Sequence, residues 1–282
     1  MYYSHMNPNS SPPVQTPGYV ARPDGRVAYD VDGDGPLVVL VPGMGDLRGT
    51  YRFLAPALRC AGYRVACTDL RGHGDSDTTF ASYGDLETAG DVIALIELLG
   101  NPAVVVGNSM GAAAATLVSA QRPELVDGLV LIGPFVRDGE VSAMQRLVLR
   151  VGMAPAWAAM SWKAYLPKLY AGQRPTDFAE YRARVIASLR RPGYAKAFSR
   201  TTRISHDPAQ ARLADVSSPT LVIMGKMDPD FPDPDAEAQW IARALDAEVV
   251  MVSEAGHYPQ SQRPDVTADA VVHFLKTVHD GA

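Results

Sequence analysis

Cysteine is nearly absent from this chain. Only Cys60 and Cys67 occur among 282 residues, the first at the end of a predicted helix and the second in the strand that follows. A chain of this length buries enough apolar surface to be stable without disulfides or a structural metal. We interpret both cysteines as small buried side chains. This predicts no disulfide, no metal site and a cytoplasmic protein.

Long apolar runs are also missing. The longest, such as Leu37–Val41, are far too short to cross a bilayer, so we expect no membrane span. The amino-terminal stretch is polar and rich in proline, unlike a signal peptide. We interpret residues 1–17 as a flexible arm, with residues 1–5 as an added leader and Met6 as the native start.

An excess of positive charge is missing as well. The chain carries 26 Lys and Arg against 31 Asp and Glu, a formal net charge of −5. No basic segment interleaved with aromatic residues occurs, which argues against nucleic acid as a partner. We expect a small-molecule partner, and nothing in the sequence indicates an oligomeric state.

Short apolar runs alternate with helical patterns along most of the chain. Leu37–Val41, Ala103–Val106 and Thr220–Met224 are continuous apolar runs, typical of strands buried on both faces of a parallel sheet. Helical periodicity separates runs of this kind. The sequence therefore predicts an α/β fold with a mostly parallel central sheet and helices on both faces.

The alternation breaks between residues 135 and 210. This region has helix-like stretches and no core strand, and it carries 13 Lys and Arg against 5 Asp and Glu. We interpret it as a helical lid inserted into one core formed by residues 18–134 and 211–282.

A nucleophile-elbow pattern lies at Gly107-Asn108-Ser109-Met110-Gly111. It follows the Ala103–Val106 strand and opens a helix rich in small residues. A strand, Gly-x-Ser-x-Gly and a helix together predict a serine held on a sharp turn above the sheet edge. The hydroxyl needs an adjacent base, and the base needs an orienting group.

Two segments after the predicted lid supply candidates for these groups. Asp228 follows the strand ending at Met224, and His257 follows the strand ending at Val252. Functional groups gather at the carboxyl ends of strands in open α/β sheets, so we expect both side chains to meet Ser109 there. Rivals for the acid are Asp230, Asp233 and Asp235, of which Asp235 is expected to cap the next helix.

The remaining histidines are weaker candidates for the base. We expect His206 and His279 at the surface and His273 inside the last amphipathic helix. His73, within Arg71-Gly72-His73-Gly74, is interpreted as structural, with substrate contact as the alternative.

In these features the chain resembles the α/β-hydrolase fold superfamily, in particular its lid-bearing, serine esterase-like members. Ser109, Asp228 and His257 follow one another in the same chain order as the nucleophile, acid and base of these members. The resemblance assigns Ser109 as nucleophile, Asp228 as acid and His257 as base, with no cofactor.

The resemblance extends to the loop after the third strand. Pro42-Gly43-Met44-Gly45 is similar to the oxyanion loop, so the N–H groups of Met44 and Met110 are expected to bind the oxyanion. Pro42 replaces the usual histidine and removes one supporting hydrogen bond. We also expect Gly43 and three aromatic residues to contact substrate: Trp157, Trp162 and Tyr258.

Three functions remain open from the sequence. The first is a serine esterase acting on a small or medium carboxylic ester, with activity rising through the ordinary histidine pKa of about 6.5. The second is a carbon–carbon bond hydrolase, whose members often share Gly-Asn-Ser-Met-Gly but usually have Trp where this chain has Tyr258. The third is a small-molecule receptor on the same fold.

Overall fold

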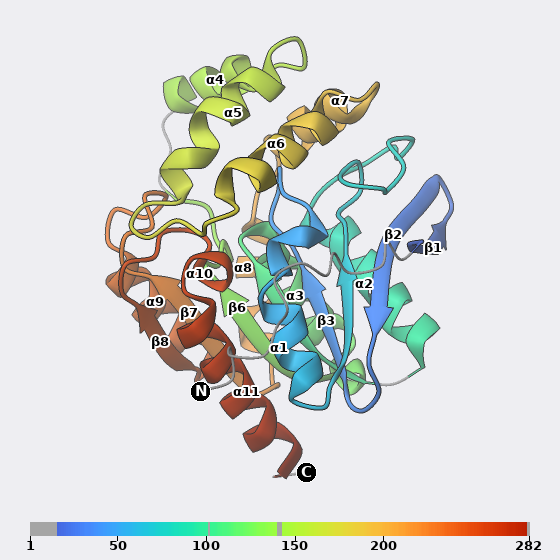
Figure 1. Ribbon diagram of the computed structural model, residues 1–282, viewed down its shortest axis with the longest axis vertical. Helices are drawn as coiled ribbons and strands as arrows, with labels where there is room; N and C mark the ends of the chain where they lie inside the picture. The colour runs from blue at the N-terminus through green and yellow to red at the C-terminus, as the bar shows by residue number, and fades with distance from the viewer. Residues whose placement is uncertain (1–15, 101, 140–142, 281–282) are drawn as a thin grey trace.

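The computed structural model describes residues 16–100, 102–139 and 143–280, which form one sheet, its covering helices and a helical insertion (Figure 1). The expected arm, residues 1–17, lies outside this range except for its last two residues. None of the helices in these ranges is long and apolar enough to cross a bilayer.

The sheet has eight strands in the order β1-β2-β4-β3-β5-β6-β7-β8. β1 pairs with β2 and β2 pairs with β4 in antiparallel fashion, and every pair from β4 to β8 is parallel. The strand bounds are, in chain order: β1 Gly18–Arg22, β2 Gly25–Asp32, β3 Leu37–Val41, β4 Arg64–Thr68, β5 Ala103–Asn108, β6 Val126–Ile132, β7 Thr220–Gly225 and β8 Glu248–Val252. The predicted mostly parallel sheet is confirmed.

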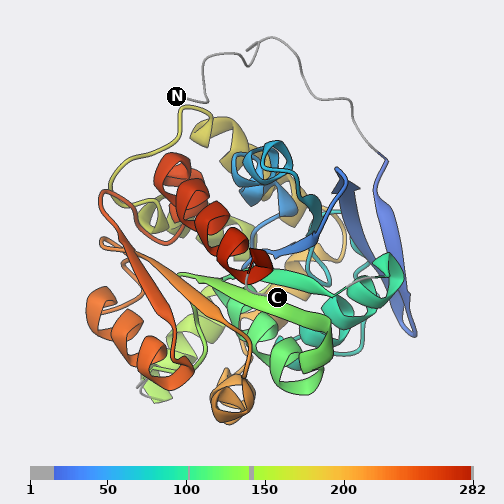
Figure 2. The same cartoon turned by 90° about the horizontal axis from the view of Figure 1, so that it is seen from below.

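Helices cover both faces of the sheet, as predicted (Figure 2). One face packs against α1 (Leu54–Cys60) and α11 (Pro264–Asp280). The other packs against α2 (Asp85–Leu99), α3 (Met110–Gln121) and α9 (Pro234–Leu245). The continuous apolar strands are buried because alternate side chains enter these two separate cores.

The start of α9 corrects one local prediction. Asp233, not Asp235, caps this helix, since its carboxylate accepts the N–H of Ala236 at 2.9 Å. Pro234 takes the first helical position, where its fixed φ is favourable and its missing N–H costs nothing. The helix therefore begins two residues earlier than the cap at Asp235 would require.

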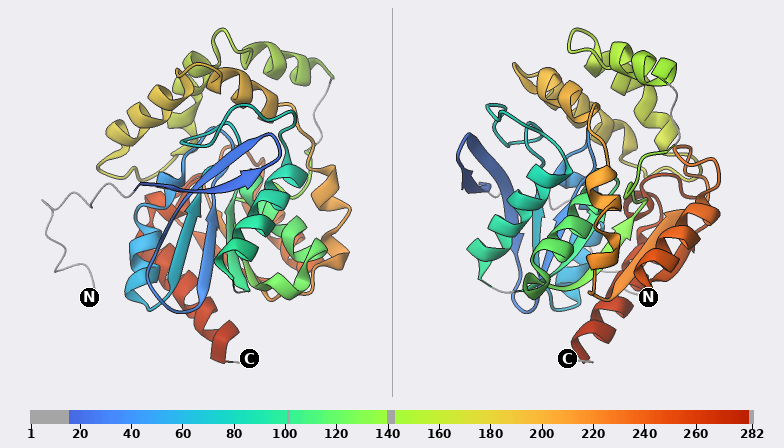
Figure 3. Two further views of the ribbon diagram at one scale, coloured as in Figure 1. Left: turned by 90° about the vertical axis from the view of Figure 1, so that its right-hand side faces the viewer. Right: turned by 180° about the vertical axis from the view of Figure 1, so that it is seen from behind.

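The segment between β6 and β7 is helical in its described part. It contains α4 (Ala143–Gly152), α5 (Ala158–Leu169), α6 (Phe178–Leu189), α7 (Tyr194–Thr201) and α8 (Asp207–Gln210). The first four stand together at one end of the molecule, above the sheet (Figure 3), whereas Ala209 of α8 packs into the core beside α2 and α3.

Several polar contacts join this insertion to the core, and two of them lie near the loop after β3. Arg52 forms a paired ion bridge with Asp177, with Nε–Oδ2 and Nη2–Oδ1 distances of 2.6 and 2.7 Å. The Tyr181 hydroxyl donates to the buried carboxylate of Asp46, which lies directly after the predicted oxyanion loop. The insertion is thus attached to the loop that it covers.

Candidate active site

Ser109 occupies a strained turn between β5 and α3. Its φ of 56° and ψ of −123° lie in a backbone region that residues other than glycine rarely adopt. The turn is possible because its flanking residues are glycines. A Cβ at Gly107 would lie 2.2 Å from the carbonyl oxygen of Gly111, and one at Gly111 would lie 2.3 Å from that of Val41. The predicted elbow geometry is therefore present.

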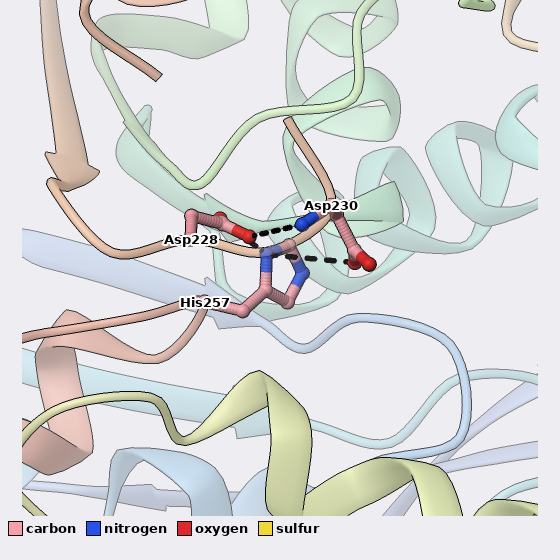
Figure 4. Close-up of side chains that lie close together, drawn as sticks. All are labelled: Asp228, Asp230 and His257. Atoms are coloured by element: carbon pink, nitrogen blue, oxygen red, sulfur yellow. Dashed lines mark hydrogen bonds and ion pairs between the residues drawn. The ribbon is translucent and has the colours of Figure 1, made fainter. Parts of the chain in front are cut away.

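His257 and Asp228 form a buried hydrogen-bonded pair at the carboxyl ends of β8 and β7 (Figure 4). His257 Nδ1 lies 2.7 Å from Asp228 Oδ2, and both residues are 2% exposed. An Nδ1–H that donates to the carboxylate leaves Nε2 as the proton acceptor, which is the tautomer a general base requires.

The electrostatics of this pair favour the imidazolium. Burial by itself lowers the pKa of His257, but the charge and hydrogen bond of Asp228 more than offset burial and raise this pKa to about 9. A midpoint set by this pKa would lie above the value of about 6.5 expected from the sequence, which assumes a solvated imidazole.

Ser109 and His257 are brought together through shared neighbours. The Ser109 N–H donates to the carbonyl of Ile132 at 3.0 Å, and the next residue, Gly133, lies against the imidazole. A Cβ at Gly133 would lie 3.2 Å from His257 Nδ1. The Asn108 amide donates to the backbone carbonyl of His257 at 3.2 Å. Within the described part of the chain, no hydrogen bond joins Ser109 Oγ to His257.

Two backbone N–H groups near Ser109 have no acceptor among the residues that the structure describes. Met110 is the first residue of α3, so its N–H has no partner within the helix. The Met44 N–H, on the loop after β3, donates to no group in the described part of the chain. A Cβ added at Gly43 would lie 3.3 Å from Ser109 Oγ, so the loop runs directly beside the hydroxyl. These groups can bind a developing oxyanion.

His73 supports this loop, a role that the sequence did not reveal. Its Nε2 accepts the N–H of Gly45 at 2.9 Å, while Nδ1 donates to the carbonyl of Arg71 at 2.8 Å. Burial lowers the pKa of His73 to about 4, so the ring is neutral and Nε2 can accept. The structural interpretation of His73 thus becomes specific: the loop that lacks a histidine at Pro42 is held by a histidine from another loop.

The predicted aromatic contacts differ in their relation to the site. Trp162 on α5 is buried, and its indole N–H donates to the carbonyl of Gly45 at 2.8 Å. Tyr258 lies edge-on to His257 and stacks on Tyr170 at 4.7 Å between ring centroids. Trp157 is 42% exposed, and its indole N–H donates to the carbonyl of Val151. Substrate contact by these residues stays a prediction.

Three further side chains surround His257. Asp230 Oδ2 lies 4.0 Å from Nδ1, and the Tyr165 hydroxyl of α5 donates to the other oxygen of Asp230. The ring of Phe135, at the start of the insertion, lies edge-on to the imidazole at 5.7 Å. Asp230 was visible in the sequence as a rival acid, but Phe135 carries no signal without the fold.

Asp228, Asp230 and His257 are also the described residues that could together hold a metal ion, since their ligand atoms lie within 4.8 Å of one another. His257 Nδ1 is hydrogen-bonded to Asp228 Oδ2, and Asp230 Oδ1 accepts from Tyr165.

His206 corrects another prediction. It is 6% exposed rather than superficial, and its Nδ1 lies 2.8 Å from Asp85 Oδ2. Its ring also lies 5.7 Å from that of Phe135. The polar sequence around His206 suggested a surface loop, but the end of the insertion returns to the core at this point and buries the imidazole.

The site is closed in this structure. Ser109 is 7% exposed and His257 is 2% exposed. An open cleft of about 610 Å³ lies elsewhere, beside Arg48, Arg184 and Arg191, and is lined by none of the predicted site residues.

Comparison with known proteins agrees with this fold. A family model described as "Alpha/beta hydrolase family" matches residues 38–270. The chain is 28% identical over 261 residues to a 2-(acetamidomethylene)succinate hydrolase of Mesorhizobium japonicum, covering 89% of this chain and 92% of the relative. It is 27% identical over 264 residues to a 2-hydroxy-6-oxononadienedioate/2-hydroxy-6-oxononatrienedioate hydrolase of Comamonas testosteroni, covering 89% and 91%.

Solved structures share the fold at lower identity. A bromoperoxidase from Bacillus anthracis superposes with a TM-score of 0.80 at 19% identity, covering 93% of this chain and all of that one. A thermophilic esterase from Thermogutta terrifontis superposes with a TM-score of 0.74 at 23% identity, covering 94% and 100%. With the family match over most of its length, the chain belongs to the alpha/beta hydrolase family.

Proposed function

We propose that this hydrolase cleaves small or medium carboxylic esters through an acyl-enzyme. His257 Nε2 takes the proton of Ser109 as its Oγ attacks the ester carbonyl, and Asp228 holds the imidazole in the required tautomer. The N–H groups of Met44 and Met110 stabilise the oxyanion. The imidazolium then protonates the leaving alcohol, and a water deprotonated by His257 releases the acid and restores Ser109.

The observation that carries this proposal is the placement of Ser109. A serine held at φ 56° between β5 and α3 is strained, and strain of this kind persists where surrounding structure imposes it. The unpaired N–H groups of Met44 and Met110 lie at the same turn, and the His257–Asp228 pair lies across Gly133. An ordinary helix cap requires none of these features.

We further propose that residues 135–210 act as the lid of this site. Trp162 and Tyr165 reach from α5 to Gly45 and Asp230. Because Ser109 is only 7% exposed, we expect the entry of a substrate to move contacts of this kind. The lid side chains then determine which acyl and alcohol groups fit.

Carbon–carbon bond hydrolysis is the second candidate, since one relative is a hydrolase of 2-hydroxy-6-oxo dienedioates and the similarity spans 89% of this chain. Both reactions need the same serine and oxyanion donors. The two candidates differ in the bond cleaved, so substrates separate them.

The test is a p-nitrophenyl ester series of increasing acyl length, run beside a vinylogous diketone. We expect sustained ester turnover that falls by several orders of magnitude in Ser109→Ala, with Ser82→Ala, an exposed serine, as the matched control. Preferential cleavage of the diketone would instead assign the carbon–carbon reaction. Saturable binding with no more than one turnover would indicate a receptor.

A further inference from the structure

The first helix of the insertion is apolar but not packed. Met144, Leu147, Val148, Leu149 and Val151 on α4 are between 47% and 67% exposed. Among the α4 side chains that the structure describes, none is buried. An isolated helix of ten residues is marginal in water and normally depends on an apolar face covered by a partner. The apolar surface of α4 is therefore left uncovered by the described part of the chain, although a helix of this composition normally packs against a partner.

The start of α5 extends this surface. Trp157 and Met160 are 42% and 67% exposed, and the Trp157 indole N–H donates to the carbonyl of Val151 at the end of α4. We call these seven exposed residues of α4 and early α5 the lid patch. The other exposed large apolar side chains of the described residues lie away from this segment, namely Tyr19 on β1, Leu86 and Leu98 on α2, and Met227 in the loop after β7. Contiguous apolar exposure of this kind marks an interaction site.

The charge around the lid patch has one sign. From Ala143 to Leu169 the sequence contains four basic residues, Arg146, Arg150, Lys163 and Lys168, and no Asp or Glu. Arg150, Lys163 and Lys168 are exposed. The whole protein carries a net charge of −5, so this segment is a local basic region on an acidic molecule. Its electrostatic complement is an anionic surface.

The lid patch is also accessible to a large flat partner. Figures 1 and 3 place α4 at the extreme end of the molecule, beyond α5 and away from the sheet. A helix rich in apolar residues with basic neighbours and no spanning length binds in the plane of a lipid interface, with apolar side chains in the headgroup–acyl boundary and cations at the headgroups.

We propose that the lid patch docks on the surface of an anionic lipid bilayer. The exposed side chains of α4, with Trp157 and Met160, enter the interface, and Arg150, Lys163 and Lys168 contact anionic headgroups. This surface belongs to the fold and does not depend on the proposed ester chemistry.

The experiment is binding of the full chain to vesicles of phosphatidylcholine alone or with about 30% phosphatidylglycerol, followed by sedimentation. We expect binding to the anionic vesicles that weakens at high salt. Arg150→Gln with Lys163→Gln should weaken it about twenty-fivefold, since each cation near an anionic surface contributes about fivefold. Met144→Gln with Leu147→Gln and Val148→Gln should weaken it at least about tenfold.

The matched control is Leu86→Gln with Leu98→Gln, which removes two apolar side chains of similar exposure from α2. Binding should be unchanged. Thermal unfolding of each variant tests folding, and quenching of tryptophan emission by brominated lipid tests insertion in the unaltered chain, with Trp157→Phe as its control.

Three results would overturn the proposal. They are no binding to either vesicle, equal loss of binding in the Leu86 and Leu98 control, and a solution dimer that becomes monomeric when Leu147 and Val148 are replaced. The last result would assign the lid patch to a second copy of the chain instead.

Discussion

Two carboxylates face the same imidazole, and substitution should separate their roles. Asp228 Oδ2 lies 2.7 Å from His257 Nδ1, whereas Asp230 Oδ2 lies 4.0 Å away and Asp230 accepts a hydrogen bond from Tyr165 (Figure 4). We expect Asp228→Asn to remove the orienting acceptor, and Asp230→Asn to remove only a nearby negative charge, because the amide oxygen can still accept from Tyr165.

The two substitutions should change different quantities, namely kcat for Asp228→Asn and the pH midpoint of activity for Asp230→Asn. An amide in place of the orienting carboxylate favours the wrong imidazole tautomer and should lower kcat by about 10⁴. Two unit charges 4.0 Å apart interact by about 1–4 kcal/mol for effective dielectric constants from about 80 to 20. Because about 1.4 kcal/mol corresponds to one pH unit, Asp230→Asn should move the activity midpoint toward acid by about one to three pH units.

The assay is kcat/KM for a p-nitrophenyl ester from pH 5 to 10, corrected for spontaneous hydrolysis. Only neutral His257 accepts a proton, so activity is lost as pH falls through its pKa of about 9. Asp230→Asn should keep the alkaline plateau and shift the midpoint, while Asp228→Asn should lower the plateau. If Asp230→Asn abolished activity and Asp228→Asn retained it, the assignment of the acid would be wrong.

Three further results are expected. Gly43→Ala should lower kcat at least about 10²-fold, because its Cβ would lie 2.7 Å from Ser109 Cβ and displace an oxyanion donor; full activity would contradict the predicted loop. His73→Ala should lower kcat and should lower the free energy of unfolding in urea by about 1–3 kcal/mol, since the buried Gly45 N–H loses its acceptor. An unchanged kcat would mean that His73 contributes to stability alone. Because the pKa of His257 is raised in the folded protein, its contribution to stability is complete below about pH 6.5. The free energy of unfolding should therefore fall as pH rises through about 9. A His257→Gln variant should lack this decline.

Much of the architecture followed from local patterns. Continuous apolar runs identified the buried parallel strands, and Gly107, Ser109 and Gly111 identified the turn between β5 and α3. These features are readable because burial on both faces and a sharp turn restrict which residues are allowed at each position.

Other features needed the folded chain. Asp228 and Asp230 are two residues apart and chemically identical. The resemblance favoured Asp228, and the structure adds that Asp228 lies closer to His257 than Asp230 does. The support of Gly45 by His73 joins residues 28 positions apart.

The amino-acid sequence alone was enough to predict the strands, the helices and the order of the reactive groups, because periodicity and turn chemistry are local. Tertiary structure decided which carboxylate holds the imidazole, which histidine supports the oxyanion loop, that His206 is buried, and that α4 is left uncovered. Hydrogen bonding and burial depend on distances between segments far apart along the chain, and only their packing sets those distances.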